Sequence, residues 1–240
     1  MEIVELRRLA AKEELSLNYL AKDEMISKVL FQLQETEDII LKGGTAISRV
    51  YTRNKRFSED IDFDLSFSGN VKEAVKRTKE IVNKLQGFKI EKERIMNQTI
   101  RYDLFYLNPL EHQDKIRLEF RVTKKPAKYT KKIVNFGFVP AESSLINVYD
   151  IEEMIIQKID CILNRTEGKD FFDMYYLLDL EQKKLHLSKD IKENLLKRFQ
   201  LDEKEINAMA HVINHYLPRT QRPSWSIFLS ELEKKVKDKL

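Results

Sequence analysis

Residues 41–65 constrain the fold of this chain more than any other stretch. An apolar run, residues 39–41, leads into them and ends at Gly43-Gly44-Thr45. Residues 46–51 predict a short helix, and a basic loop follows. The stretch closes with residues 61–65, in which apolar and acidic side chains alternate strictly, as they do in a half-buried strand. This order predicts a small α+β unit with two strands joined by a glycine turn, a helix and a loop.

Three carboxylates share one side of the second strand. They belong to Asp60, Asp62 and Asp64, since residues i and i+2 of a strand face the same way. Like charges that lie so close repel one another unless a cation lies between them. Alternating Asp residues also occur on the solvated face of an edge strand. Two hard oxygen ligands, with room for water and phosphate oxygens, are typical of a magnesium site.

The glycine pair indicates an anion site beside these carboxylates. Gly43 and Gly44 let the backbone approach a ligand closely. If a helix starts at Thr45, its free N–H groups and the threonine hydroxyl form an anion cradle. Taken singly, a Gly-Gly pair is an ordinary turn, and the loop with Arg53, Lys55 and Arg56 an ordinary solvated loop. The combination predicts a triphosphate held between backbone amides and Mg²⁺.

The segment GGTAISRVYTRNKRFSEDIDFDL resembles the nucleotidyltransferase core of the AbiEii/AbiGii abortive-infection toxin family, a branch of the DNA polymerase β-like superfamily. The resemblance implies a minimal nucleotidyltransferase fold that binds a nucleoside triphosphate. It assigns Asp60 and Asp62 to the metal. It assigns the following residues to nucleotide binding: Gly43, Gly44, Thr45, Arg56 and Ser58.

A third carboxylate has two candidates. Residues 115–122 alternate strictly, which places Glu119 among Lys and Arg side chains on one face of a strand. From the residues alone, such a Glu is as well explained by a surface ion pair. Polymerase β-like enzymes place a third carboxylate on a strand beside the Asp pair, and Glu119 lies at the matching place. Asp103 is the rival candidate.

A second constellation lies in residues 150–180, which predict two helices joined at residues 166–168. Lys158 and Arg165 lie two turns apart on the first helix, and Asp170 and Asp173 share a face of the second. Without any role in a functional site, Lys158 would be a solvated helix residue, and Asp170 and Asp173 would interact with the dipole at the start of their helix. The pattern K-x-x-[AC]-x-x-x-R followed by K-D-x-x-D also resembles the second half of the same toxins. The resemblance implies that Lys158 reaches the triphosphate and that the other three either help shape the nucleotide site or orient Lys158.

Composition narrows the class of protein. The 240 residues are 42% hydrophobic and 34% charged, with a net charge of +4, which is compatible with a nucleotide or RNA partner. One cysteine, Cys161, excludes an internal disulfide and a cysteine-based zinc site. No apolar run reaches membrane-spanning length, and the N-terminal residues do not resemble a signal peptide. We therefore expect a cytoplasmic protein without a membrane partner.

The expected architecture is α+β. Residues 1–145 predict a mixed sheet flanked by helices, a nucleotidyltransferase core whose first 33 residues form two helices that pack as core without chemistry. Residues 146–240 predict a helical domain that closes the nucleotide cleft.

The expected function is that of a toxin enzyme. With Mg²⁺ or Mn²⁺ bound, the family transfers NMP from GTP, CTP or ATP to an acceptor, either RNA such as the tRNA 3′ end or a protein. An AbiEi-like antitoxin, encoded nearby, is the expected partner in a type IV toxin–antitoxin system that acts in abortive infection and phage defence. The alternatives are a nucleotidyltransferase of the antibiotic-modifying kind and a non-catalytic nucleotide-binding module.

Overall fold

The computed structural model describes all 240 residues, apart from the side chains of Glu91 and Lys92. The chain divides into two compact units, Met1–Asp150 and Ile151–Leu240, and each is described by itself. None of the helices in the described part of the chain combines the length and the apolar character needed to cross a membrane.

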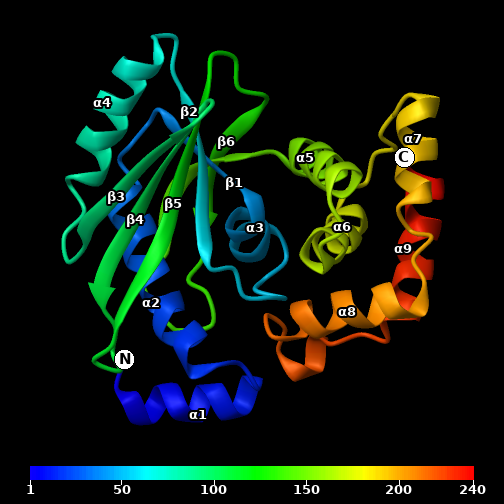
Figure 1. The fold of residues 1–240 in the computed structure, drawn as a ribbon, viewed down its shortest axis with the longest axis horizontal. Helices are drawn as coiled ribbons and strands as arrows, with labels where there is room; N and C mark the ends of the chain where they lie inside the picture. The colour runs from blue at the N-terminus through cyan, green and yellow to red at the C-terminus, as the bar shows by residue number, and fades with distance from the viewer. The chain divides into compact units, whose positions relative to one another are not determined.

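Seven strands form one mixed sheet in the first unit: β1 (Ile39–Lys42), β2 (Asp60–Ser66), β3 (Lys89–Met96), β4 (Thr99–Leu107), β5 (Gln113–Thr123), β6 (Tyr129–Val134) and β7 (Ser144–Tyr149). Their order is β3-β4-β5-β2-β1-β7-β6, and Figure 1 shows the sheet with β2 near its middle. Strand β2 pairs antiparallel with β1 and parallel with β5, and β1 pairs parallel with β7. The acidic strand is therefore internal to the sheet.

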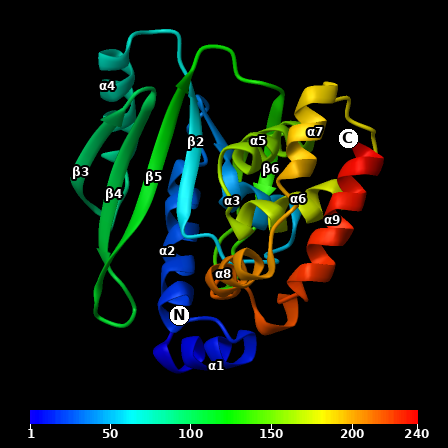
Figure 2. The same ribbon diagram turned by 45° about the vertical axis from the view of Figure 1, so that its right-hand side comes forward.

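Helices α1 (Ile3–Glu13), α2 (Leu17–Leu33), α3 (Gly43–Ala46) and α4 (Val71–Val82) belong to the same unit, and the π-helical turn η1 (Ile47–Tyr51) continues α3. In Figures 1 and 2, α2 and α4 lie on one side of the sheet and α3 on the other. The two helices expected in the first 33 residues are confirmed as α1 and α2.

The apolar face of the sheet forms the core of the first unit. Phe63 of β2 stacks on Phe120 of β5, with ring centroids 5.7 Å apart, and Tyr102 of β4 meets Phe120 edge-on. The Tyr102 hydroxyl lies 2.8 Å from the hydroxyl of Thr78, which joins α4 to this face. Each fully buried side chain of this size stabilises the fold by about 1.5–3 kcal/mol. The alternation in β2 thus places the aromatic residues in the core and the carboxylates on the opposite face.

The second unit is helical. Its elements are α5 (Ile151–Asn164), α6 (Gly168–Leu180), α7 (Lys189–Lys197), α8 (Glu203–Asn214), the short 3₁₀ turn η2 (Arg219–Gln221) and α9 (Trp225–Lys239). Helix α6 is central, since it packs against α5, α8 and α9. Phe172 of α6 stacks on Phe228 of α9, with centroids 5.9 Å apart.

The expected α+β class is confirmed by this mixed sheet with flanking helices. The domain boundary expected at residue 145 lies inside β7. Strand β7 pairs with both β1 and β6, and the first compact unit accordingly runs to Asp150.

Candidate active site

The acidic face of β2 adjoins charged residues on both neighbouring strands. Asp62 is the register partner of Lys42 on β1 and of Glu119 on β5, while Asp60 is opposite Arg117. Register partners on neighbouring strands lie about 4.8 Å apart and share a face of the sheet. The expected metal residues Asp60 and Asp62 therefore lie on one face with Glu119 beside them.

The glycine turn packs directly on this strand. A Cβ atom added to Gly43, whose φ is +68°, would lie 2.4 Å from Oδ2 of Asp62. A Cβ added to Gly44 would lie 2.4 Å from Nη2 of Arg56 and 2.8 Å from Oγ of Ser58. Both glycines are thus required for the turn to approach so closely. The predicted nucleotide-binding residues of the first unit therefore lie beside the Asp pair. They are Gly43, Gly44 and Thr45 of the turn and Arg56 and Ser58 of the loop.

Thr45 joins the turn to the start of the acidic strand. The helical segment begins at Gly43 rather than at Thr45, and Thr45 is fully buried. Its hydroxyl donates to the carbonyl oxygen of Asp60 at 2.5 Å. The hydroxyl is therefore used to fix the strand, and the free backbone N–H groups of the first helical residues are what the segment offers to an anion.

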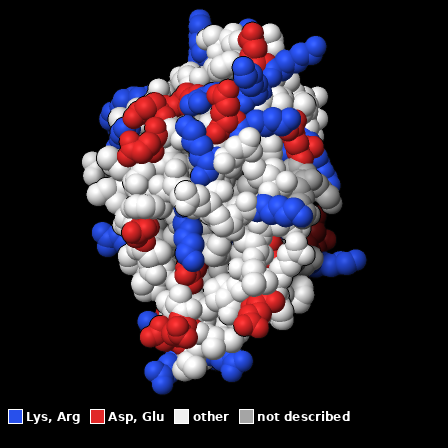
Figure 3. Space-filling view, turned by 90° about the vertical axis from the view of Figure 1, so that its left-hand side faces the viewer, with Lys and Arg blue, Asp and Glu red and all other residues white. Residues whose placement is uncertain are grey.

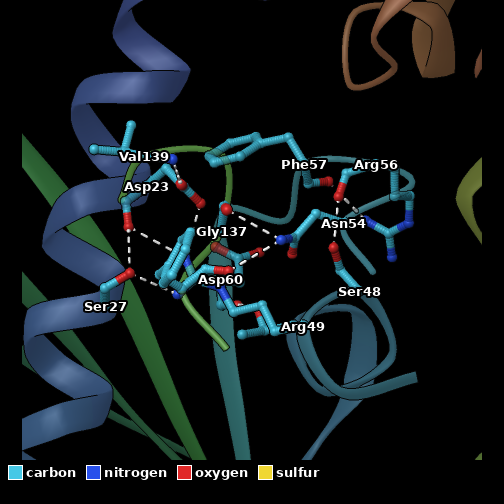
Figure 4. Close-up of polar contacts among 12 residues, drawn as sticks. Asp23, Ser27, Ser48, Arg49, Asn54, Arg56, Phe57, Asp60, Gly137 and Val139 are labelled. Atoms are coloured by element: carbon cyan, nitrogen blue, oxygen red, sulfur yellow. Dashed lines mark hydrogen bonds and ion pairs between the residues drawn. The ribbon is translucent and has the colours of Figure 1, made fainter. Parts of the chain in front are cut away.

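Arg56 is 3% exposed, so it is not a solvated loop residue. Its Nη1 donates to the carbonyl oxygen of Phe57 at 2.9 Å, and its own carbonyl oxygen accepts from Ser48 Oγ at 2.6 Å. Figure 4 shows Ser48 and Arg56 meeting between the helical segment and the loop. These bonds hold the guanidinium beside Gly44.

A buried ion pair lies behind the helical segment. Asp23 of α2 and Arg49 of η1 are 2% and 3% exposed, and Oδ1 of Asp23 lies 2.8 Å from Nη2 of Arg49. Arg49 also donates to Ser27 Oγ at 2.8 Å, and the Val139 amide donates to Asp23 Oδ2 at 2.8 Å. A Cβ at Gly137 would lie 1.9 Å from Oδ1 of Asp23. Figure 4 shows this cluster joining α2, η1 and residues 137–139.

Burial raises the pKa of the Asp23 carboxyl, and the Arg49 charge and the amides of Phe138 and Val139 oppose that rise. Sequence reasoning missed the pair, because α2 was interpreted as core without chemistry. The available signal was that Asp23 and Ser27 stand on the apolar stripe of α2, between Leu20 and Leu30.

The remaining carboxylates of this face are engaged by cations. Arg101 donates to Oε1 of Glu119 from Nε at 2.7 Å, and its Nη2 lies 2.6 Å from the same oxygen. Lys115 donates to Asp103 at 2.9 Å. Asp64 is buried, forms an ion pair with Lys42 and accepts from the Tyr149 hydroxyl at 2.6 Å.

Among the side chains that the structure describes, no group of three or more His, Cys, Asp and Glu is gathered as a metal centre would be. The choice between Glu119 and Asp103 as third carboxylate stays a prediction.

The chemistry of the donors nevertheless fits a divalent cation at the Asp pair. Carboxylate oxygens are the ligands that Mg²⁺ prefers, and Mg²⁺ is commonly held by one or two carboxylates together with substrate phosphates. The Asp60 side chain is 34% exposed, with Oδ2 at 3.1 Å from Nη1 of Arg117. Backbone N–H groups suited to a phosphate begin at Gly43, whose turn packs on Asp62.

The second predicted group comes together inside the second unit. The Lys158 ammonium lies 2.8 Å from Asp170 and 2.7 Å from Asp173, and all three residues are at most 6% exposed. Arg165 Nε donates to Oδ2 of Asp170 at 2.8 Å. Burial raises the pKa of Asp170, but the charges of Lys158 and Arg165 outweigh it and hold that pKa below its ordinary value. Lys158 is therefore a buried, doubly paired cation rather than a solvated one. Burial raises the pKa of the neighbouring Cys161 thiol.

Comparison with solved structures supports the fold. The chain is similar to JHP933 from Helicobacter pylori, with 19% identity and a TM-score of 0.59 over 93% of this chain and 95% of that one. It is similar to MenT4, a nucleotidyltransferase toxin from Mycobacterium tuberculosis H37Rv, with 15% identity and a TM-score of 0.61 over 99% and 90% of the two chains. The search of curated protein sequences found no match.

Comparison with protein-family models identifies the class. The model described as "Nucleotidyl transferase AbiEii toxin, Type IV TA system" matches residues 27–239, which include both groups of predicted site residues. The chain therefore belongs to the AbiEii nucleotidyl transferase toxin family of type IV toxin–antitoxin systems and is a nucleotidyltransferase.

Proposed function

We propose that this enzyme transfers a nucleoside monophosphate from an NTP to a hydroxyl of an RNA acceptor, and that the transfer depends on Mg²⁺ or Mn²⁺. The observation that supports this most is the contact between the glycine turn and the acidic strand, where a Cβ at Gly43 would lie 2.4 Å from Oδ2 of Asp62. It brings the residues suited to phosphate and those suited to a divalent cation into one place.

The residues of the first unit have separate tasks in this proposal. Asp60 and Asp62 hold the cation, with Glu119 as the third ligand. The backbone N–H groups that begin at Gly43 bind phosphate oxygens, because an anion at a helix start interacts with unpaired N–H groups and with the helix dipole. Arg56 and Ser58, held against Gly44, complete the nucleotide site. The cation, when bound, neutralises the charge that develops on the phosphate oxygens.

The bond changes follow from the chemistry of the substrates. An oxygen of the acceptor hydroxyl attacks the α-phosphorus, the bond between that phosphorus and the β-bridging oxygen breaks, and pyrophosphate leaves. The hydroxyl proton passes to a carboxylate of the site. Within the second unit, Asp170 and Asp173 hold the Lys158 ammonium, which the family resemblance assigns to the triphosphate, and Arg165 holds Asp170 in turn.

The test is to incubate the protein with each of the four NTPs, labelled at the α-phosphate, and with total RNA, in Mg²⁺, Mn²⁺ or a chelator. We expect label on RNA in the presence of either metal, and none with Asp60→Ala. Glu80→Ala, an exposed carboxylate on α4, is the matched control and should transfer label normally. Equal transfer by Asp60→Ala, or no label on any acceptor, would contradict the proposal.

A cellular test separates toxin action from modification of a small molecule. A toxin should arrest growth on expression, Asp60→Ala should relieve the arrest, and co-expression of an AbiEi-like antitoxin encoded beside the gene should relieve it too. An enzyme that modifies an antibiotic should leave growth unchanged without the drug.

A further inference from the structure

Cations gather on the face of β3, β4 and β5 that continues the acidic face of β2. Among the described side chains, we name five of them the cationic face: Arg94, Arg101, Lys115, Arg117 and Arg121. The strand register places them in rows that start at the Asp residues of β2. One row runs from Asp62 through Glu119 and Arg101 to Arg94, and a second from Asp64 to Arg121. From β2 to β3 the first row crosses three strand spacings, or about 14 Å.

The cationic face carries a net positive charge. The carboxylates among its five cations are Glu119, which Arg101 engages, and Asp103, which Lys115 engages. Burial raises the pKa of Asp103, but the charges of Lys115, Arg94 and Arg117 lower it by more than burial raises it. The pKa of Asp103 therefore lies below its ordinary value. The charges of Arg94 and Arg117 thus act on the same carboxylate that Lys115 contacts. Arg94 and Arg121 are exposed, and neither is the register partner of Asp60 or Asp62.

No helix of the first unit, as far as that unit is described, covers this side of β3–β5. Figures 1 and 2 both show α2 and α4 on the opposite side of these strands, where the apolar residues lie. A sheet face left open by its own unit usually meets water or a partner. Here the residues on it are suited to an anion, because guanidinium groups match the geometry of phosphate oxygens.

We propose that the cationic face binds the phosphodiester backbone of the RNA acceptor and leads its terminal hydroxyl to Asp60 and Asp62. This rests on the function proposed above. A terminal ribose hydroxyl can reach the carboxylates only if the phosphates of the same strand trail away from them. The cations on β5, the strand beside the Asp pair, and on the strands out to the edge strand β3 lie where those phosphates would be.

The other side of the sheet supplies a matched control. Figure 3 shows the side of the molecule that lies on the left of Figure 1, and there Lys and Arg are interspersed with Asp and Glu. Lys76 on α4 and Lys84 just beyond it are exposed, and changing both to Gln lowers the net charge by as much as changing Arg94 and Arg121.

The test uses the full chain and a fluorescein-labelled, single-stranded oligoribonucleotide with a free 3′ hydroxyl. Its dissociation constant is measured by anisotropy over a range of salt concentrations for wild type, the double variant Arg94→Gln/Arg121→Gln, and the control Lys76→Gln/Lys84→Gln. Each phosphate contact contributes about 0.7 to the slope of log affinity against log salt for a single strand, so the arginine variant should lose about 1.4 of that slope. When the salt concentration falls tenfold, the affinity of the arginine variant should therefore rise about 25-fold less than that of wild type. The lysine control should bind as wild type does at every salt concentration.

Nucleotide binding separates this proposal from the one on which it rests. Calorimetric titration with NTP and Mg²⁺ should give the same dissociation constant for the arginine variant and for wild type. An unchanged salt slope in that variant, or an equal loss in the lysine control, would overturn the RNA surface and leave nucleotidyl transfer standing. Transfer of label to a protein in place of RNA would overturn it as well. Loss of NTP binding by the arginine variant would also refute it, since these residues would then serve the nucleotide.

Discussion

The Asp23–Arg49 pair is buried directly behind the helical segment that begins at Gly43, and removing one partner tests its role. In Asp23→Ala the guanidinium keeps its charge, because arginine does not lose its proton in proteins, at a position that is only 3% exposed in the wild-type chain. Removing one partner of a buried pair costs about 3–5 kcal/mol. At about 2–4 °C per kcal/mol for a chain of this length, the melting temperature should fall by about 6–20 °C.

The assay must localise the loss, because a chain with two compact units need not unfold in one step. Amide hydrogen exchange, read by peptide, should show reduced protection in α2, in residues 43–51 and at Val139, which the pair joins. Tyr102→Phe is the control, since it removes a buried hydroxyl contact between β4 and α4 that involves neither Asp23 nor Arg49. It should cost about 1 kcal/mol and reduce protection in α4 and β4.

A second variant separates charge from packing. Asp23→Leu combined with Arg49→Met removes both charges, and apolar replacement of a buried pair is often neutral or stabilising. The Val139 amide then loses its acceptor, at about 1–3 kcal/mol, so the double variant should recover about half of what Asp23→Ala loses. It should also raise KM for the NTP, because an apolar contact does not fix the direction of the helix that begins at Gly43. A cost below about 1 kcal/mol for Asp23→Ala, or no recovery in the double variant, would refute this reasoning.

Three further predictions concern the predicted site residues. Gly43→Ala places a Cβ 2.4 Å from Oδ2 of Asp62 on backbone with φ +68°, so NTP affinity in Mg²⁺, measured by calorimetry, should fall at least about tenfold, the equivalent of about 1.4 kcal/mol. Glu119→Gln should slow labelled transfer about 100-fold, as loss of a transition-state contact does, whereas Asp103→Asn should stay within a few-fold. A reversed order would make Asp103 the third ligand. The pKa of Asp170 is lowered in the folded chain, so its stabilising contribution is present above the unfolded value of 3.8 and is lost as pH falls through the lower folded pKa. Denaturant titrations below about pH 4 should therefore show a shallower pH dependence for Asp170→Asn than for wild type.

The local parts of the site could be predicted from the sequence because their signals are local. Strict alternation in residues 61–65 depends only on the period of a strand, and it correctly places Asp60 and Asp62 on one face. The need for glycine at residues 43 and 44 follows from a turn that packs closely on its neighbour. The helical spacing of Asp170 and Asp173 likewise predicts one shared face, and both accept the Lys158 ammonium.

The contacts that fix these parts could not be predicted, because they join residues far apart in the chain. Asp23 meets the Val139 amide across 116 positions, and although its place on the apolar stripe of α2 indicates burial, nothing local shows which residues it meets. The hydrogen bond from Arg101 to Glu119 forms only because β4 pairs with β5. Strand β7 looks from its sequence like a short extended lead-in, and only its pairing with β1 and β6 makes it part of the sheet.

Both units bury full charges, in the first beside residues that the family resemblance assigns to the site and in the second at such residues themselves. Asp23 and Arg49 lie behind the segment that begins at Gly43, and Lys158 lies between Asp170 and Asp173. Apolar side chains would hold such positions at no loss of stability in many proteins, since desolvation of an ion pair offsets much of its attraction. What an apolar pair lacks is direction, because only hydrogen-bonded charges fix an orientation as well as a distance. The buried pairs are therefore best explained by the need to orient a helix start and an ammonium, and their apolar replacements should keep the fold while activity falls.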